Sequence, residues 1–115
     1  MPPPFLKVRD VLEFATIEGA KACGLDSRVG TLTPGKEADI ILLRTDRFNV
    51  MPMNNAVGAV VTSMHAGNVD AVLISGQIKK RNGQLAGVDV ERVAKLVEAS
   101  RDRTFAAAKY ERAKF

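Results

Sequence analysis

The sequence has 115 residues, of which 46% are hydrophobic and 26% are charged. This length fits one domain with a modest core, and this composition excludes a globally disordered chain. The apolar runs are far too short to span a membrane, and the single cysteine excludes an internal disulfide. Met1-Pro2-Pro3-Pro4 has neither the charged nor the apolar region of a signal peptide, so we expect a cytoplasmic location.

The net charge of +4 is concentrated at the end of the chain. From residue 101 onward, five Lys or Arg residues and two Asp or Glu residues give +3, which leaves +1 for residues 1–100. A basic helix can contact nucleic acid, but no aromatic-rich basic patch or reader motif accompanies these charges. We therefore expect a solvated helix face, with neither nucleic acid nor a membrane as a partner.

The first elements of the chain are predicted to be an extended arm and a helix. Three successive prolines favour extended backbone over residues 1–6. From Val8, apolar residues recur at i, i+3, i+4 and i+7, which predicts a helix over Lys7–Cys23 with a bend near its middle. Gly19 weakens this helix unless a neighbour approaches closely there, and Gly24 is well placed as its C-cap.

From residue 30 onward the pattern changes to that of strands. Ile40–Leu43 is apolar without alternation, which predicts a strand covered on both faces. Further strands are predicted at Val57–Thr62, Val69–Ile74 and Gln77–Lys80. Ser75-Gly76 and Asn82-Gly83 are predicted to form hairpin turns, of which Asn82-Gly83 is the stronger signal.

The remaining segments are a loop and a second helix. Asn49–Asn55, with Pro52, is predicted to be a loop. Asp89 is a good N-cap for a helix that begins at Val90 and continues through the alanines to Tyr110 or beyond. Helix, strands and helix follow one another without repeated strand–helix alternation, so the fold class is α+β with a small, mainly antiparallel sheet.

Few residues have the spacing of a catalytic motif. Gly30–Asp39 contains Gly-Lys but lacks the spacing and the Ser or Thr of a P-loop. Nothing in the sequence joins Ser63, His65 and Asp70 into a triad. We expect His65 to lie in a loop or at the surface, because a catalytic metal site needs three or more protein ligands. Cys23 is expected to pack like a small hydrophobic residue.

Asp39 stands directly before an apolar strand and has two interpretations. It could be a catalytic acid. The interpretation that we prefer is structural, with its carboxylate accepting hydrogen bonds from backbone N–H groups of the Gly30–Gly35 loop. On motifs alone, the chain is an α+β module without a visible active site.

Two stretches of the sequence carry a family resemblance. They are VLEFATIEGAKACGLDSRVGTLTPGKEADIILLRTDRFNVMP and VDAVLISGQIKKRNGQL. Together they resemble the C-terminal end of amidohydrolase superfamily enzymes, in the branch of triazine hydrolases and of guanine, cytosine, S-adenosylhomocysteine and methylthioadenosine deaminases. The resemblance covers nearly all of residues 8–86. The positions that carry it are Thr16, Gly19, Ala20, Gly30, Gly35, Ala38, Asp39, Gly76 and Gly83.

The resemblance implies a particular architecture. Such enzymes join a metal-bearing (β/α)₈ barrel to a small β-sandwich made from both chain ends, and a barrel takes about 250 residues. Lys7–Cys23 would then match the last barrel helix, and Asp39–Leu85 the C-terminal share of the sandwich. We expect an arm and barrel-type helix over 1–28, a sandwich portion over 29–86, a C-terminal helix over 87–115, and no complete barrel. The residues expected to be structural are Gly19, Gly24, Gly30, Gly35, Asp39, Gly76 and Gly83.

The resemblance also implies where the chemistry lies. The family's divalent metal, such as zinc or iron, is held by a His-X-His pair, two further histidines and an aspartate on barrel strands. None of these motifs occurs here, so no catalytic, metal-binding or cofactor-binding residue is assigned to this chain. In the family the metal activates water to attack a C–N or C–Cl carbon of cyclic amidine, purine, pyrimidine or triazine-like substrates.

We therefore expect the C-terminal, non-catalytic part of an amidohydrolase, inactive by itself. Its expected partner is the N-terminal part of such an enzyme or another copy of the chain in a homo-oligomer. The alternative is a small, self-associating module without enzymatic activity.

Overall fold

The computed structural model describes residues 5–111, and residues 1–4 and 112–115 lie outside that description. Most of the predicted extended arm falls in the first of these segments. The helices are α1 (Val8–Glu13), the π-helical turn η1 (Phe14–Glu18), α2 (Gly19–Ala22), the 3₁₀ turn η2 (Phe48–Val50), α3 (Ala56–Thr62), the 3₁₀ turn η3 (Ala66–Asn68) and α4 (Val90–Ala107). The strands are β1 (Ile40–Leu43), β2 (Val69–Ile74), β3 (Gln77–Arg81) and β4 (Gln84–Leu85).

The predicted N-terminal helix is confirmed, because α1, η1 and α2 follow one another without a break. The backbone N–H of Lys7 donates to the Asp10 carboxylate at 2.8 Å, which satisfies one of the free donors at the helix start. The π-helical turn falls where the bend was expected, and such turns are a recognised cause of helix irregularity. Gly24, at φ 68°, ends the helix in the left-handed conformation predicted for its C-cap.

The four strands form one antiparallel sheet in the order β1-β2-β3-β4. Ser75 and Gly76 have φ of 47° and 76°, and Asn82 and Gly83 have φ of 52° and 75°. Two consecutive positive values are the signature of the tight turns that match strand twist, so both predicted hairpin turns are confirmed. In this order β1 and β4 are the two edges of the sheet.

The predicted strand at Val57–Thr62 is wrong, because Ala56–Thr62 is the helix α3. Asn55 caps this helix, and its side-chain oxygen accepts from the backbone N–H of Gly58 at 2.8 Å. The apolar side chains of the segment also recur at helical spacing, at Val57, Val60 and Val61. The apolar run is compatible with a strand and with a helix, and the Asn55 cap favours the helix.

The segment Asn49–Asn55 was expected to be a plain loop. It overlaps the short 3₁₀ turn η2 at its start.

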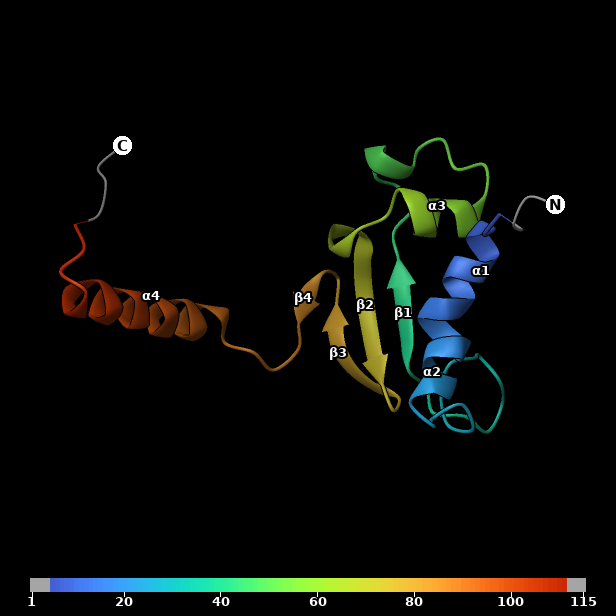
Figure 1. Cartoon of the computed structure of the whole chain (residues 1–115), viewed down its shortest axis with the longest axis horizontal. Coiled ribbons are helices and arrows are strands. Elements are labelled where there is room, and N and C mark those ends of the chain that lie inside the picture. The colour runs from blue at the N-terminus through green and yellow to red at the C-terminus, as the bar shows by residue number, and fades with distance from the viewer. Residues whose placement is uncertain (1–4, 112–115) are drawn as a thin grey trace.

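The predicted C-terminal helix is confirmed as α4, although it ends at Ala107 and does not reach Tyr110. The Asp89 side chain accepts from the backbone N–H of Arg92 at 2.9 Å, as expected of an N-cap. Figure 1 shows α4 standing apart from the sheet at the end of an extended linker. The radius of gyration is 20.0 Å, against about 13 Å for a compact chain of this length. By itself, the chain does not close around one core.

The buried core of the described residues is small. Its apolar members are Ala20, Val50 and Ala71, and its polar member is Asn68. Ile41 and Leu42, in the middle of β1, are 56% and 54% exposed, so the prediction that this strand is covered on both faces is wrong for the chain alone. A run without alternation needs a layer on each side, and residues 5–111 do not supply both. Within those residues, no helix combines the length and apolar character needed to cross a membrane.

Candidate functional site

The crossing from the N-terminal helix to β1 depends on a close approach at Gly30. Its φ is 93°, and an added Cβ would lie 2.8 Å from the Ala20 Cβ and 3.0 Å from the Ile17 Cα. No other residue fits there without displacing the helix backbone. Of the other glycines expected to be structural, Gly19 lies within the helix at φ −61°. The remainder have positive φ, namely Gly24, Gly35, Gly76 and Gly83.

Two carboxylates tie the start of β1 to the turn between β2 and β3. The Asp39 carboxylate accepts from the backbone N–H of Ser75 at 2.7 Å. Glu37 accepts from the Ser75 hydroxyl at 2.8 Å and from the Arg28 Nε at 2.7 Å. The Ser75 hydroxyl and then the Arg28 guanidinium lower the pKa of Glu37 below its ordinary value. Asp39 thus accepts a backbone N–H, but from the hairpin turn and not from the Gly30–Gly35 loop, which corrects the predicted donor.

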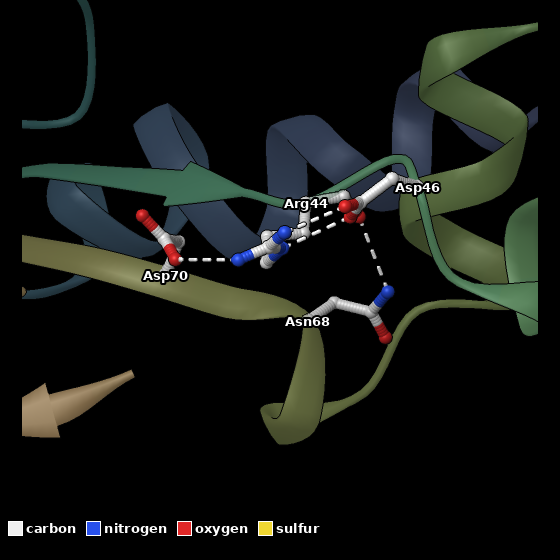
Figure 2. A network of polar contacts seen from close by, with 4 residues as sticks. All are labelled: Arg44, Asp46, Asn68 and Asp70. Carbon is white, nitrogen blue, oxygen red and sulfur yellow. Dashed lines mark hydrogen bonds and ion pairs between the residues drawn. The ribbon is translucent and has the colours of Figure 1, made fainter. Parts of the chain in front are cut away.

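A charged cluster lies where β1 ends beside the start of β2 (Figure 2). Arg44 donates to both carboxylate oxygens of Asp46, at 2.9 and 2.6 Å, and its other terminal nitrogen is 3.5 Å from Asp70. The bidentate pair lowers the pKa of Asp46 to about 2 and raises the pKa of Arg44. Arg44 thus pairs with an acid on each side, and through Asp70 it links the end of β1 to the start of β2.

Asn68 is the fully buried residue of this region. Its Nδ2 donates to the Arg44 carbonyl at 3.2 Å, and its Oδ1 accepts from the His65 backbone N–H at 3.2 Å. Its amide also forms a reciprocal pair with Asn49, at 2.9 and 3.4 Å. The Asn68 side chain therefore joins the backbone at Arg44, the backbone at His65 and the side chain of Asn49. Its role has no signal in the sequence, because an Asn before a strand indicates a turn and says nothing of burial.

The residues that were considered for a triad are not brought together. His65 is exposed, and its Nδ1 accepts from the Gly67 backbone N–H at 3.0 Å. Asp70 faces Arg44, and the Ser63 hydroxyl lies 3.2 Å from the Thr62 hydroxyl. Over residues 5–111, no group of three His, Cys, Asp or Glu side chains could hold a metal ion. The described residues do not fit the catalytic metal that the resemblance implied.

A concave feature of the described residues is an apolar groove of about 570 Å³ between the N-terminal helix and β1. Its walls include Leu12, Ala20 and Cys23 from the helix, Val29 from the crossing segment, and Ile40 and Ile41 from β1. Among the described residues that line the groove, Asp39 is the one with an acidic or basic side chain. Lined in this way, the groove can bind an apolar surface and lacks the paired groups that acid–base chemistry needs.

Comparison with known proteins gives the family. A sequence model of the amidohydrolase family matches residues 5–79, which is well over half of the chain. The 5-methylthioadenosine/S-adenosylhomocysteine deaminase of Acetivibrio thermocellus is 38% identical over 93 residues, which are 81% of this chain and 22% of that relative. The 5′-deoxyadenosine deaminase of Methanothermobacter thermautotrophicus is 38% identical over 98 residues, or 85% of this chain and 22% of that relative.

Solved structures show the same fold. An adenosine deaminase of Xanthomonas campestris with bound zinc superposes with a TM-score of 0.81 at 26% identity, over 85% of this chain and 22% of that one. An atrazine chlorohydrolase of Arthrobacter aurescens complexed with zinc superposes with a TM-score of 0.74 at 24% identity, over 83% and 21%. The described helix, crossing and sheet thus share the fold of about a fifth of those two solved chains. The chain belongs to the amidohydrolase family, and it spans about a fifth of the length of the curated relatives it matches.

Proposed function

We propose that this chain is the C-terminal, non-catalytic part of a metal-dependent amidohydrolase that deaminates a purine nucleoside-like substrate. The observation that carries the proposal is the combination of a family match over 5–79 with a length about a fifth of that of the deaminase relatives. The names of those relatives support the substrate class, as they act on adenosine derivatives. On this proposal, the catalytic metal is held by residues outside the described chain.

The contacts support a bracing role for the chain within the larger enzyme. Asp39 and Glu37 bind Ser75, and Gly30 lets the crossing segment approach the helix, so that helix and sheet keep one relative position. We infer that the four-stranded sheet is the C-terminal share of a β-sandwich and that the N-terminal helix belongs to the barrel. The exposed middle of β1 and the apolar groove are then surfaces that the rest of the enzyme covers.

The test is an assay of the purified chain beside the Acetivibrio thermocellus deaminase. Ammonia release from S-adenosylhomocysteine and 5′-deoxyadenosine is measured together with zinc content by elemental analysis. We expect turnover for the relative, and neither turnover nor stoichiometric zinc for this chain. Stoichiometric zinc or turnover by the chain alone would contradict the proposal.

A second candidate is a self-associating module without enzymatic activity. The observation that favours it is the apolar surface of α4, where Val90, Val93, Leu96 and Val97 are between 48% and 63% exposed. Another copy is the nearest surface that could cover such side chains in the isolated chain. Sedimentation of the chain with and without an amidohydrolase partner separates the two candidates, because only an independent module keeps its oligomer when that partner is present.

A further inference from the structure

The turn between β3 and β4 contains an Asn-Gly pair that the fold leaves accessible. Asn82 and Gly83 have φ of 52° and 75°, and both residues are exposed. Nothing lies within 4 Å of the position that a Cβ on Gly83 would take, so this side of the turn is open to solvent. Asn82 is also the one asparagine of the sequence that a glycine follows, since the others are Asn49, Asn54, Asn55 and Asn68.

Few contacts hold this turn closed. β4 has two residues, and neither β3 nor β4 contains a buried residue. The backbone N–H of Gly83 donates to the Asp70 carbonyl at 2.9 Å, and the backbone N–H of Ala86 donates to the Lys79 carbonyl at 2.9 Å. Short, exposed parts of a sheet open at a low free energy while the rest stays folded. We therefore expect the turn to open locally.

We propose that Asn82 is a deamidation site, at which its side-chain amide reacts with the backbone nitrogen of Gly83. In the opened turn the Gly83 nitrogen loses its proton and attacks the Asn82 Cγ. The N–Cγ bond forms, the Cγ–Nδ2 bond breaks, and Nδ2 takes up a proton and leaves as ammonia, which closes a cyclic succinimide. Water then opens the succinimide at one of its two carbonyls and leaves an aspartyl or an isoaspartyl residue.

Two features of the turn act on the rate in opposite directions. Glycine favours the attack, because it has no Cβ to obstruct its nitrogen and its backbone adopts many conformations. The hydrogen bond from the Gly83 N–H to the Asp70 carbonyl opposes the attack, because it must break before the nitrogen is free to react. The reaction should therefore be slower than in an unstructured peptide of the same sequence and faster than at the other asparagines of the chain.

The isoaspartyl product changes the end of the sheet. Its main chain runs through Cβ and Cγ, so the turn becomes longer by one CH₂ group, and a carboxylate replaces the neutral amide. The pairing of Arg81 with Gln84 and the hydrogen bond of Gly83 to Asp70 both depend on the length of this turn. We expect β4 to separate from β3 and the linker to α4 to gain freedom, while β1 and β2 stay paired.

The experiment incubates the purified chain at mildly alkaline pH and follows each asparagine by peptide mass mapping. An isoaspartyl methyltransferase labels the isoaspartyl product independently. We expect deamidation at Asn82 to be about tenfold or more faster than at any other asparagine, since the residue that follows it has no Cβ. Similar rates at Asn82 and Asn54, which are both exposed, would overturn the assignment.

The two hairpin turns give matched variants. Gly83→Ala should slow deamidation at Asn82 by about tenfold or more, because a Cβ then stands beside the attacking nitrogen. Gly76→Ala is the control, since Gly76 also has a positive φ and open space where its Cβ would stand, yet it does not follow Asn82. We expect this control to leave the rate at Asn82 unchanged. A rate that falls equally in both variants would contradict attack by the Gly83 nitrogen.

Amide hydrogen exchange tests the structural consequence. In the isoaspartyl form, the Gly83 and Ala86 amides should exchange about tenfold or more faster than in the fresh chain, while the β1 amides keep their rates. Unchanged exchange at Gly83 and Ala86 would show that the longer turn still holds β4, which would overturn this part of the inference.

Discussion

Replacement of Asn68 by Ala is predicted to destabilise the chain more than any exposed substitution. The side chain is 0% exposed and bonds the Arg44 carbonyl and the His65 N–H (Figure 2 shows the Arg44 contact). Its loss removes the Asn68 partner of those two groups and of the Asn49 amide, which keeps its bond to the Ser63 carbonyl. Each unsatisfied buried group costs about 1–3 kcal/mol, and partial relaxation reduces the sum, so we expect a loss of about 2 kcal/mol in the free energy of unfolding.

Urea denaturation followed by circular dichroism measures this loss. For a small chain, the free energy of unfolding falls by about 1–2 kcal/mol per molar urea, so the midpoint should move down by about 1–2 M. Asn54→Ala is the control, because Asn54 is exposed, and surface changes usually stay within about 0.5 kcal/mol. Asn68→Asp should also destabilise the chain at neutral pH, since it replaces the donor that faces the Arg44 carbonyl by a carboxylate oxygen. Equal midpoints for Asn68→Ala and Asn54→Ala would refute the assignment of Asn68 as the polar centre of this region.

Three further predictions follow from the other contacts. Asp39→Ala should cost about 1 kcal/mol, because it removes a charge-assisted bond to the Ser75 N–H, while Glu91→Ala should stay within about 0.5 kcal/mol; identical urea midpoints would show that Asp39 is not structural. The lowered pKa values of Glu37 and Asp46 mean that the folded chain binds fewer protons than the unfolded chain. The contribution of these two carboxylates to the free energy of unfolding should therefore be fully present above their ordinary pKa values of 4.5 and 3.8, and it should decline as the pH falls through these values toward about 2. A urea midpoint that stays flat between pH 6 and pH 3 would contradict this. The isolated chain should sediment as an oligomer at micromolar concentration, since Ile41, Leu42 and the apolar face of α4 are exposed, and a stable species with the mass of one chain would show that these surfaces need no cover.

The elements with local signals were predictable from the sequence. Gly24 at the helix end, Asp89 at the start of α4, and the pairs Ser75-Gly76 and Asn82-Gly83 each fix a backbone conformation through their own chemistry. The strand prediction at Val57–Thr62 is wrong because this apolar run is compatible with both helix and strand, and the Asn55 cap favours the helix.

The tertiary contacts were less predictable. The partner of Asp39 lies 36 residues away at Ser75, and only a folded hairpin brings that N–H to the carboxylate. The burial of Asn68 likewise depends on how η2, η3 and β1 meet, which no local pattern encodes. The exposure of Ile41 and Leu42 has another cause. An apolar run without alternation is typical of a strand that is covered on both faces, and residues 5–111 do not supply both covering layers.

The central claim is that this chain completes an amidohydrolase whose metal and catalytic groups lie elsewhere. Its most direct test uses the Acetivibrio thermocellus deaminase shortened by the 93 residues that this chain matches. The chain is titrated into this partner, and ammonia release from S-adenosylhomocysteine is measured. We expect no activity from either component alone and activity that rises with added chain and saturates at one chain per partner. Activity that does not change on addition of the chain, or that the chain shows without the partner, would contradict the account.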